Sequence, residues 1–255
     1  MNQISATFIK GLKDNLMSIS SLFWVIAWPI IWLLLGVFVF MKGVPEAYLG
    51  IAKGQTTLSM VTFSFMIAGM TSLAATISED RYKGLFLKLK SIPVQPWKES
   101  IGRILSVLFY AIISVIIILV VGISLGAEFS FTTINLFKSI GFLILGILAS
   151  AGVGLVCGSL IKSIQGAIMT AVGISVITSA ISGVFFDYSM LSKPLQAFSR
   201  YWPMSSTNQI ISFYLTGNAG FDATSTSNIL SNIAISLAFF FIGLTIYTKF
   251  CWKKE

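Results

Sequence analysis

Residues that could carry out catalysis are few in this chain and lie far apart. Histidine is absent, which removes the commonest general base and the commonest metal ligand. The two cysteines, Cys157 and Cys251, give neither a disulfide framework nor a metal-binding spacing. The phosphate-binding pattern GxxxxGK[ST] does not occur. We therefore expect no catalytic residue, no metal site and no cofactor in this chain, and no ATP hydrolysis by it.

Charge is concentrated in one stretch, Glu79–Glu99 (EDRYKGLFLKLKSIPVQPWKE). Its charged residues are Arg81, Lys83, Lys88, Lys90, Lys98, Glu79, Asp80 and Glu99. On a helical wheel the apolar residues of this stretch fall within one arc, and basic residues flank both edges of that arc. The residues of the arc are Tyr82, Leu85, Phe86, Leu89 and Ile92. Pro93 and Pro96 end such a helix. The pattern predicts an amphipathic helix over about 80–97, held against a membrane surface; the alternative is an ordinary basic loop.

The composition shows which elements must position this stretch. Of the 255 residues, 56% are hydrophobic and 10% charged, with a mean hydropathy of +0.90. Soluble domains carry about 25% charged residues, so an integral membrane protein is indicated. The apolar runs are continuous, which predicts helices instead of a β-barrel. We expect an all-α single domain over 1–255 with six spans, near Ser21–Met41, Thr57–Ser78, Ile104–Gly126, Ser139–Ile161, Ser163–Phe186 and Asn228–Thr248.

Basic residues give the expected orientation. An even number of spans places both termini on one side, together with the charged stretch and the turn at Lys162. Twelve of the 17 basic residues lie on that side and five on the other. The excess predicts cytoplasmic termini in a multi-pass protein of the cell membrane. It also accounts for the net charge of +8 without a nucleic-acid partner.

Two further segments predict helices outside the spans. Residues 1–20 carry apolar side chains four apart, which suits a helix lying flat on the membrane; a short solvated tail is the alternative. Residues 187–227 form the longest outer segment, ahead of the last span and tail at 228–255. Apolar residues there recur at helical spacing, interrupted by Pro194 and ended by Pro203. With Phe198 and Trp202 they predict one or two short helices on or dipping into the outer leaflet.

The six predicted spans contain no Asp, Glu, Lys or Arg. Proton relays and ion paths in membranes use such residues, so an ion-coupled carrier or a membrane enzyme is disfavoured. Small-residue faces such as Gly154xxxGly158 predict either tight packing within one subunit or a dimer interface. The aromatic residues Phe23, Trp24 and Trp28 of the first span predict an interface or internal packing. A contribution to a substrate path is the alternative.

The residues Glu79-Asp80-Arg81…Gly84…Leu89…Pro93-Val94 resemble the E-R-x-x-G-T-L-x-x-L-x-x-x-P-V pattern of ABC type-2 permeases, the family of daunorubicin-resistance-like and polysaccharide exporters. The order of elements is similar over nearly the whole chain. Three positions depart from the pattern, namely Tyr82, Leu85 and Leu87.

The resemblance implies that the charged stretch is a coupling helix seated in a separate ATPase subunit. Glu79 and Arg81 are then candidates for charged contacts with the ATPase or the N-terminal helix. Apolar contacts would come from Leu85, Phe86 and Leu89, with Gly84 and Pro93 bounding the helix. The resemblance further implies two permease subunits, identical or not, and a pair of ATPase subunits that bind ATP and magnesium.

The charge-poor spans suit hydrophobic or amphipathic cargo such as drugs, lipids or antimicrobial peptides. Polysaccharide exporters typically carry a basic, tyrosine-rich stretch before the first span, whereas this chain reads GLKDNLMSISSLFW. This difference favours drug or peptide efflux, with export of a cell-envelope polysaccharide such as teichoic acid as the alternative. An ATP-independent channel or secondary carrier is the alternative from another class.

Overall fold

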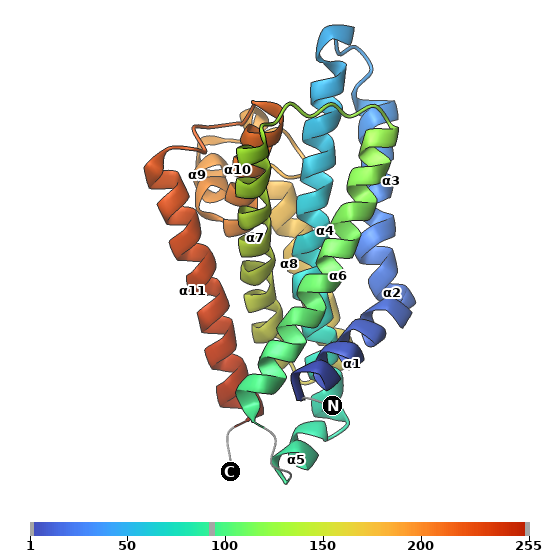
Figure 1. Ribbon diagram of the computed structural model, residues 1–255, viewed down its shortest axis with the longest axis vertical. Coiled ribbons are helices and arrows are strands. Elements are labelled where there is room, and N and C mark those ends of the chain that lie inside the picture. Colours follow the sequence, from blue (N-terminus) through green and yellow to red (C-terminus); the bar gives the residue numbers. More distant parts are fainter. Residues whose placement is uncertain (1–2, 92–94, 253–255) are drawn as a thin grey trace.

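The computed structural model describes residues 3–91 and 95–252 and is helical, with no strand in those ranges (Figure 1). Six of its helical segments are long and apolar enough to cross a membrane: Ile19–Phe40, Glu46–Tyr82, Pro96–Ser124, Thr133–Leu160, Ile164–Ile181 and Thr226–Cys251. The predicted fold class and the six spans are confirmed. Several helices run past the predicted limits, because helical hydrogen bonding continues beyond the apolar stretch into polar sequence.

The long helix α4 (Glu46–Tyr82) is the centre of the bundle (Figure 1). It packs against α6 (Pro96–Ser124), α7 (Thr133–Leu160), α8 (Ile164–Ile181) and α10 (Pro203–Thr216). Its 37 residues give a length of about 55 Å, well beyond the ~30 Å of a bilayer core. The helix therefore connects the two ends of the molecule and can carry a displacement between them.

Glycines bring α4 and α7 into close contact. A Cβ added at Gly154 would lie 2.5 Å from the carbonyl oxygen of Gly69, and one at Gly158 would lie 2.8 Å from the Cβ of Ile77. The backbones can approach only because these side chains are missing. The small-residue face of α7 is thus an internal packing surface of one subunit, as the first of the two sequence interpretations held.

The first span is divided by two π-helical turns. It consists of α2 (Ile19–Leu22), η1 (Phe23–Ala27), α3 (Trp28–Leu35) and η2 (Gly36–Phe40). Pro29 lies in the first turn of α3, where its missing N–H and its ring would disturb a regular helix. The wider turn of η1 directly before it relieves that conflict.

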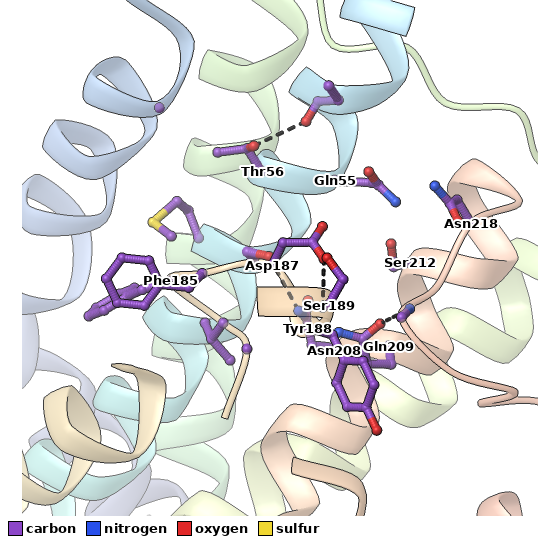
Figure 2. A pocket seen from close by; sticks show the side chains of 18 of the residues that line it. Gln55, Thr56, Phe185, Asp187, Tyr188, Ser189, Asn208, Gln209, Ser212 and Asn218 are labelled. Carbon is purple, nitrogen blue, oxygen red and sulfur yellow. Dashed lines mark hydrogen bonds between the residues drawn. The ribbon is translucent and has the colours of Figure 1, made fainter. Parts of the chain in front are cut away.

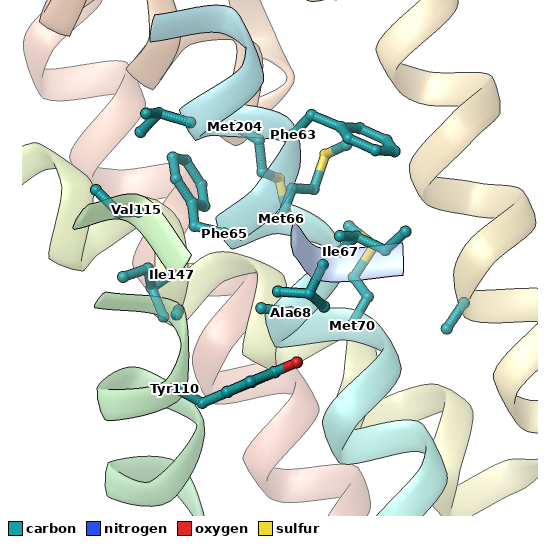
Figure 3. Close-up of a cluster of buried hydrophobic side chains, with 14 of the residues drawn as sticks. Phe63, Phe65, Met66, Ile67, Ala68, Met70, Tyr110, Val115, Ile147 and Met204 are labelled. Carbon is teal, nitrogen blue, oxygen red and sulfur yellow. The ribbon is translucent and has the colours of Figure 1, made fainter. Parts of the chain in front are cut away.

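The apolar core surrounds the middle of α4 (Figure 3). Phe63, Phe65 and Met66 are fully buried in it. The Ser64 hydroxyl lies within hydrogen-bond distance of the Val25 carbonyl oxygen, at 2.7 Å, and of the Ser114 hydroxyl, at 2.8 Å. These bonds fix the first span and α6 to α4 without placing a charge at this level of the bundle.

The two ends of the bundle differ in their short helices (Figure 1). One end, called here the α5 end, carries α1 (Gln3–Met17) and α5 (Leu85–Lys90). The predicted N-terminal helix is present as α1 and packs along α6, with Phe8 edge-on to Phe109 at 5.8 Å. Its position on a membrane surface stays a prediction.

The opposite end, called here the α10 end, carries η3 (Tyr188–Met190), α9 (Lys193–Tyr201) and α10, ahead of α11 (Thr226–Cys251). Pro194 does not interrupt a helix as expected, since it lies in the first turn of α9. Pro203 separates the two helices and begins α10. Phe198 and Trp202 stack at 5.5 Å between ring centroids. Nearly all of α10 is buried within the fold; whether α9 and α10 enter the outer leaflet stays a prediction.

Candidate functional site

The helix expected over about 80–97 is shorter in the structure. α4 continues to Tyr82, and α5 runs only from Leu85 to Lys90. Gly84 separates them in a left-handed conformation with φ of 66°, which glycine adopts without steric cost. Tyr82 consequently belongs to α4 and not to the apolar arc of α5. Pro93, the predicted end of the helix, lies outside the described residues.

One side chain fixes α5 to the membrane helices. Phe86 is 5% exposed, whereas its neighbour Leu87 is 72% exposed. The Phe86 ring lies edge-on to Tyr247 at 6.0 Å and to Trp252 at 5.7 Å, at the end of α11. Leu85 and Leu89 are half-buried. Phe86, one of the three residues predicted to make apolar contacts, therefore packs against the membrane helices of this same chain.

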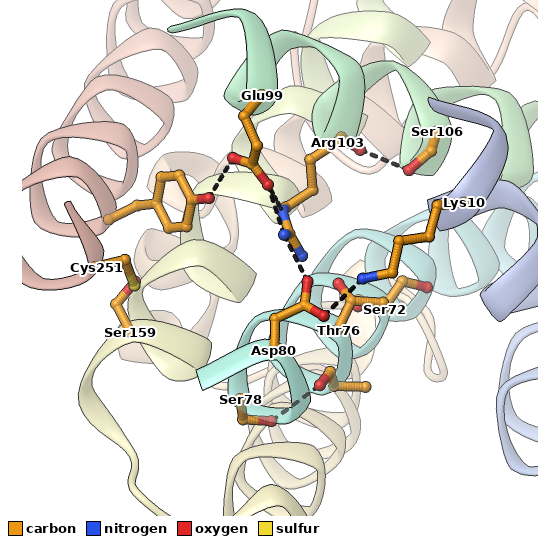
Figure 4. A network of polar contacts seen from close by, with 12 residues as sticks. Lys10, Ser72, Thr76, Ser78, Asp80, Glu99, Arg103, Ser106, Ser159 and Cys251 are labelled. Carbon is orange, nitrogen blue, oxygen red and sulfur yellow. Dashed lines mark hydrogen bonds and ion pairs between the residues drawn. The ribbon is translucent and has the colours of Figure 1, made fainter. Parts of the chain in front are cut away.

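Beneath Phe86 lies a buried network of charges (Figure 4). The Arg103 guanidinium is 5.9 Å from the Phe86 ring centroid. It donates to Asp80 at 2.7 Å and to Glu99 at 2.9 and 2.5 Å. Tyr247 donates to the other oxygen of Glu99. The network thereby joins α4, α6 and α11 under the base of α5.

Lys10 extends the network to the N-terminal helix. Its ammonium lies 2.6 Å from Oδ1 of Asp80, the carboxylate oxygen that Arg103 does not bind. Lys10 and Arg103 balance Asp80 and Glu99, and each carboxylate has two partners. A buried charge that lost its partner would be costly, so the four helices are held in one relative arrangement.

Arg81 and Glu79 make no hydrogen bond or ion pair with the N-terminal helix within 3–91 and 95–252, and their contacts with an ATPase stay a prediction. Arg81 donates to the carbonyls of Gly158, Ser159 and Ile161 at 3.0, 2.6 and 3.2 Å. It therefore caps the C-terminal end of α7, where cations are favoured. Glu79 accepts a hydrogen bond from Lys83 at 2.5 Å and thereby raises the pKa of the Lys83 ammonium. Contact with the N-terminal helix is made by Asp80 instead.

The α10 end contains a cavity of about 560 Å³ (Figure 2). It lies between the first span, α4, the chain after α8, and α10. Its polar wall includes Gln55, Ser59, Asp187, Asn208 and Asn218, and the aromatic rings of Trp32 and Phe185 line it as well. A volume of this size accommodates a drug-sized molecule.

The aromatic residues proposed for a substrate path lie elsewhere. Phe23, Trp24 and Trp28 pack on one another with ring centroids 5.4 to 6.1 Å apart. They do not line the large cavity, although Trp24 borders a second cavity of about 80 Å³ nearer the α5 end. In the first span it is Trp32 that reaches the large cavity.

The comparison with protein families decides the class. The model described as ABC-2 family transporter protein matches residues 45–248, which is most of the chain. This chain belongs to the ABC-2 family of transporters. A comparison with curated proteins finds no match. An ABC-2 permease is the membrane component of an ABC transporter and works with an ABC ATPase, since its own domain binds no nucleotide.

The network residues of this ABC-2 permease were not predicted as a site. The sequence did carry a signal, because Glu99 and Arg103 are one helical turn apart at the start of an apolar run. The partner Asp80 comes from another helix and Tyr247 from the end of the chain, so only the fold brings them together. No group of three His, Cys, Asp or Glu residues in 3–91 and 95–252 is placed to hold a metal ion.

Proposed function

We propose that this ABC-2 permease is the transmembrane subunit of an ATP-driven exporter and that α5 is the helix on which the ATPase docks. Supporting this, α5 is held to the bundle by Phe86, while Leu87 is 72% exposed and free for contact with another subunit. A groove of about 350 Å³ beside it, between α1, α4 and α5, presents both signs of charge. A docking surface of this kind offers an apolar anchor with a charged rim.

The contacts behind α5 supply a path for mechanical coupling. A displacement of α5 reaches α11 through Phe86 and Tyr247, and α6 through Arg103. It reaches α7 through Arg81, which lies in the last turn of α4. Because packed helices move as rigid bodies, a push on α5 would shift several spans together.

The proposed cargo is hydrophobic or amphipathic and leaves the cell through a path formed by two permease subunits, identical or paired with a sister protein. The middle of the bundle supports this, because the polar groups buried beside the core of α4 are uncharged, among them the hydroxyls of Ser64 and Ser114. The exposed faces of the spans are apolar, as expected for contact with lipid. Under this proposal both termini and α5 lie in the cytoplasm, as the distribution of basic residues predicts.

Co-purification tests the docking. The full-length permease, extracted in mild detergent, is expected to retain an ABC ATPase. Leu87→Glu is expected to lose that ATPase without unfolding, because Leu87 is 72% exposed in the permease and the new carboxylate would be buried in the interface. Lys13→Glu, which also adds negative charge at an exposed site of the α5 end, is the matched control and should retain it.

The opposite result is well defined. If Leu87→Glu and Lys13→Glu retain the ATPase equally, α5 is not the docking helix. If the purified permease alone moves cargo across liposomes, the function is that of an ATP-independent carrier.

A further inference from the structure

The large cavity at the α10 end is lined by acidic, aromatic and amide side chains but by no basic one. The proposed function assigns no role to this composition. Among its lining residues Asp187 is the only one with a charged side chain, and no Lys or Arg is present. We infer that this cavity binds an organic cation with an apolar body. This inference rests on the proposed function and specifies the class of cargo.

Asp187 is placed to receive a positive charge. Its Oδ1 accepts a hydrogen bond from the Ser189 backbone N–H at 2.8 Å, which fixes the carboxylate at the start of η3. Its second oxygen has no hydrogen bond within 3–91 and 95–252. Figure 2 shows the carboxylate beside the open space of the cavity. A carboxylate held by its own backbone needs no rearrangement to pair with a cation.

Arg200 contacts one residue of the cavity wall, Tyr188, but does not pair with Asp187. Arg200 donates from Nε to the Tyr188 hydroxyl at 3.0 Å, and its guanidinium lies 5.3 Å from the Phe221 ring centroid. Arg200 is not among the residues that line the cavity. Its contacts hold it at the distal end of the Tyr188 side chain, and Asp187 forms no ion pair within 3–91 and 95–252.

Aromatic rings provide the complementary apolar wall. Trp32 and Phe185 stack with centroids 5.0 Å apart, and Phe63 lies behind Phe185 at 4.9 Å. Phe40 also lines the cavity and is 66% exposed. Aromatic faces attract organic cations and bury their apolar parts, so rings and a carboxylate in the wall of one cavity suit a cationic amphiphile.

Neutral amides complete the lining. Gln55 and Asn218 face the same open space (Figure 2) and make no side-chain hydrogen bond within the part of the chain that the structure describes. Asn208 is bonded to Thr62 and Ser59, and Gln209 accepts from the Gly220 N–H. The free amide oxygens add acceptors for an ammonium group, whereas no charged donor is present for an anionic polymer.

Binding of tetraphenylphosphonium to the full-length permease in lipid nanodiscs tests the inference. Asp187→Asn keeps the shape of the side chain and is expected to weaken binding about five-fold, the upper end of what an exposed charge pair contributes, because Asp187 is exposed in the free protein. Asp187→Glu keeps the charge and should restore binding to within about two-fold. Asp222→Asn is the matched control, because it removes a carboxylate from the same end outside the cavity and should change nothing.

Three results would overturn the inference. They are equal binding by Asp187→Asn and Asp222→Asn, equal binding of the neutral triphenylphosphine oxide, and binding no tighter than to empty nanodiscs. Because these measurements need no ATPase, they separate the two proposals. If the permease fails to co-purify with an ATPase, the proposed cation site is unaffected. If it fails to bind tetraphenylphosphonium, the proposed docking role of α5 is unaffected.

Discussion

At the scale of single residues, Arg103 decides how the α5 end is held together. It is 5% exposed and bonds two carboxylates that come from different helices. Replacing a whole buried ion pair by apolar residues can be neutral, but removing one partner leaves an uncompensated charge. A single substitution in the network is therefore expected to lower the stability of the fold more than a substitution of an exposed charged residue.

Arg103→Leu is expected to destabilise the folded protein by about 3–5 kcal/mol, because Asp80 and Glu99 would remain buried without their shared cation. The measurement is unfolding of the purified protein in mixed micelles with increasing sodium dodecyl sulfate. Arg200→Leu removes the same charge from an exposed position and should cost much less. Equal destabilisation by the two changes would mean that the network contributes no special stability.

The sequence predicts some of these residue roles and not others. The sequence predicts contacts for Arg81 with an ATPase or the N-terminal helix, and within the bundle Arg81 binds the end of α7. For Phe86 it predicts apolar contact with a partner or with the membrane helices, and the structure places the ring against α11. Asp80 and Tyr247 escape prediction, because 167 positions separate them along the chain and Arg103 and Glu99 connect them only in the fold. Helical spacing reveals neighbours within one helix and is silent about partners on another.

At the scale of elements, glycines determine how closely helices pack. The backbones of α7 and α11 approach at Gly152 and Gly243, where a Cβ added at Gly152 would lie 2.2 Å from the Phe239 carbonyl oxygen. A backbone carbonyl cannot move aside as a side chain can. The two helices must separate if either glycine gains a side chain.

Gly152→Ala is expected to cost about 1–3 kcal/mol in unfolding free energy through this overpacking. Gly141→Ala is the control within the same helix, since its added Cβ meets nothing within 4 Å. It should be neutral or slightly stabilising, because alanine favours a helix more than glycine does. Both variants are compared by the same micelle titration, and a loss of stability at both positions would contradict the packing argument.

The conformation of one residue between two helices, Gly84, explains why α5 is shorter than the helix predicted over about 80–97. A helical wheel assumes one continuous helix, but Gly84 adopts a left-handed conformation that ends α4 and re-aims the chain. The sequence Lys83-Gly84 contained this signal, because glycine commonly follows the last turn of a helix. The six apolar runs, in contrast, are long enough that a few residues of uncertainty at each end do not change the span count.

At the scale of the whole molecule, the fold class, the span number and the family follow from composition, run length and motif. The cavity at the α10 end does not, because its wall combines Trp32, Gln55, Asp187 and Asn208 from four separate segments. No spacing in the sequence brings these residues together. The same long helix, α4, reaches both the cavity and the network below α5.

The orientation proposed for the molecule can be tested with single cysteines. Lys42 and Leu87 are both exposed, the first in the connection before α4 and the second on α5, at opposite ends of the bundle. The native Cys157 and Cys251 are buried, so they should give little background. Lys42→Cys is expected to react with a membrane-impermeant maleimide in intact cells, because its loop belongs to the side poor in basic residues.

In cells that produce the permease without its ATPase, Leu87→Cys is expected to react only after the cells are made permeable, since α5 must face the cytoplasm to meet an ATPase. A docked ATPase would cover this position. Labelling is measured as a mass shift on a denaturing gel, with the unmodified protein as the background. The reverse pattern, Leu87→Cys labelled in intact cells and Lys42→Cys protected, would place α5 outside the cell. It would then remove the ATPase-docking role from α5 and open the cavity at the α10 end to the cytoplasm.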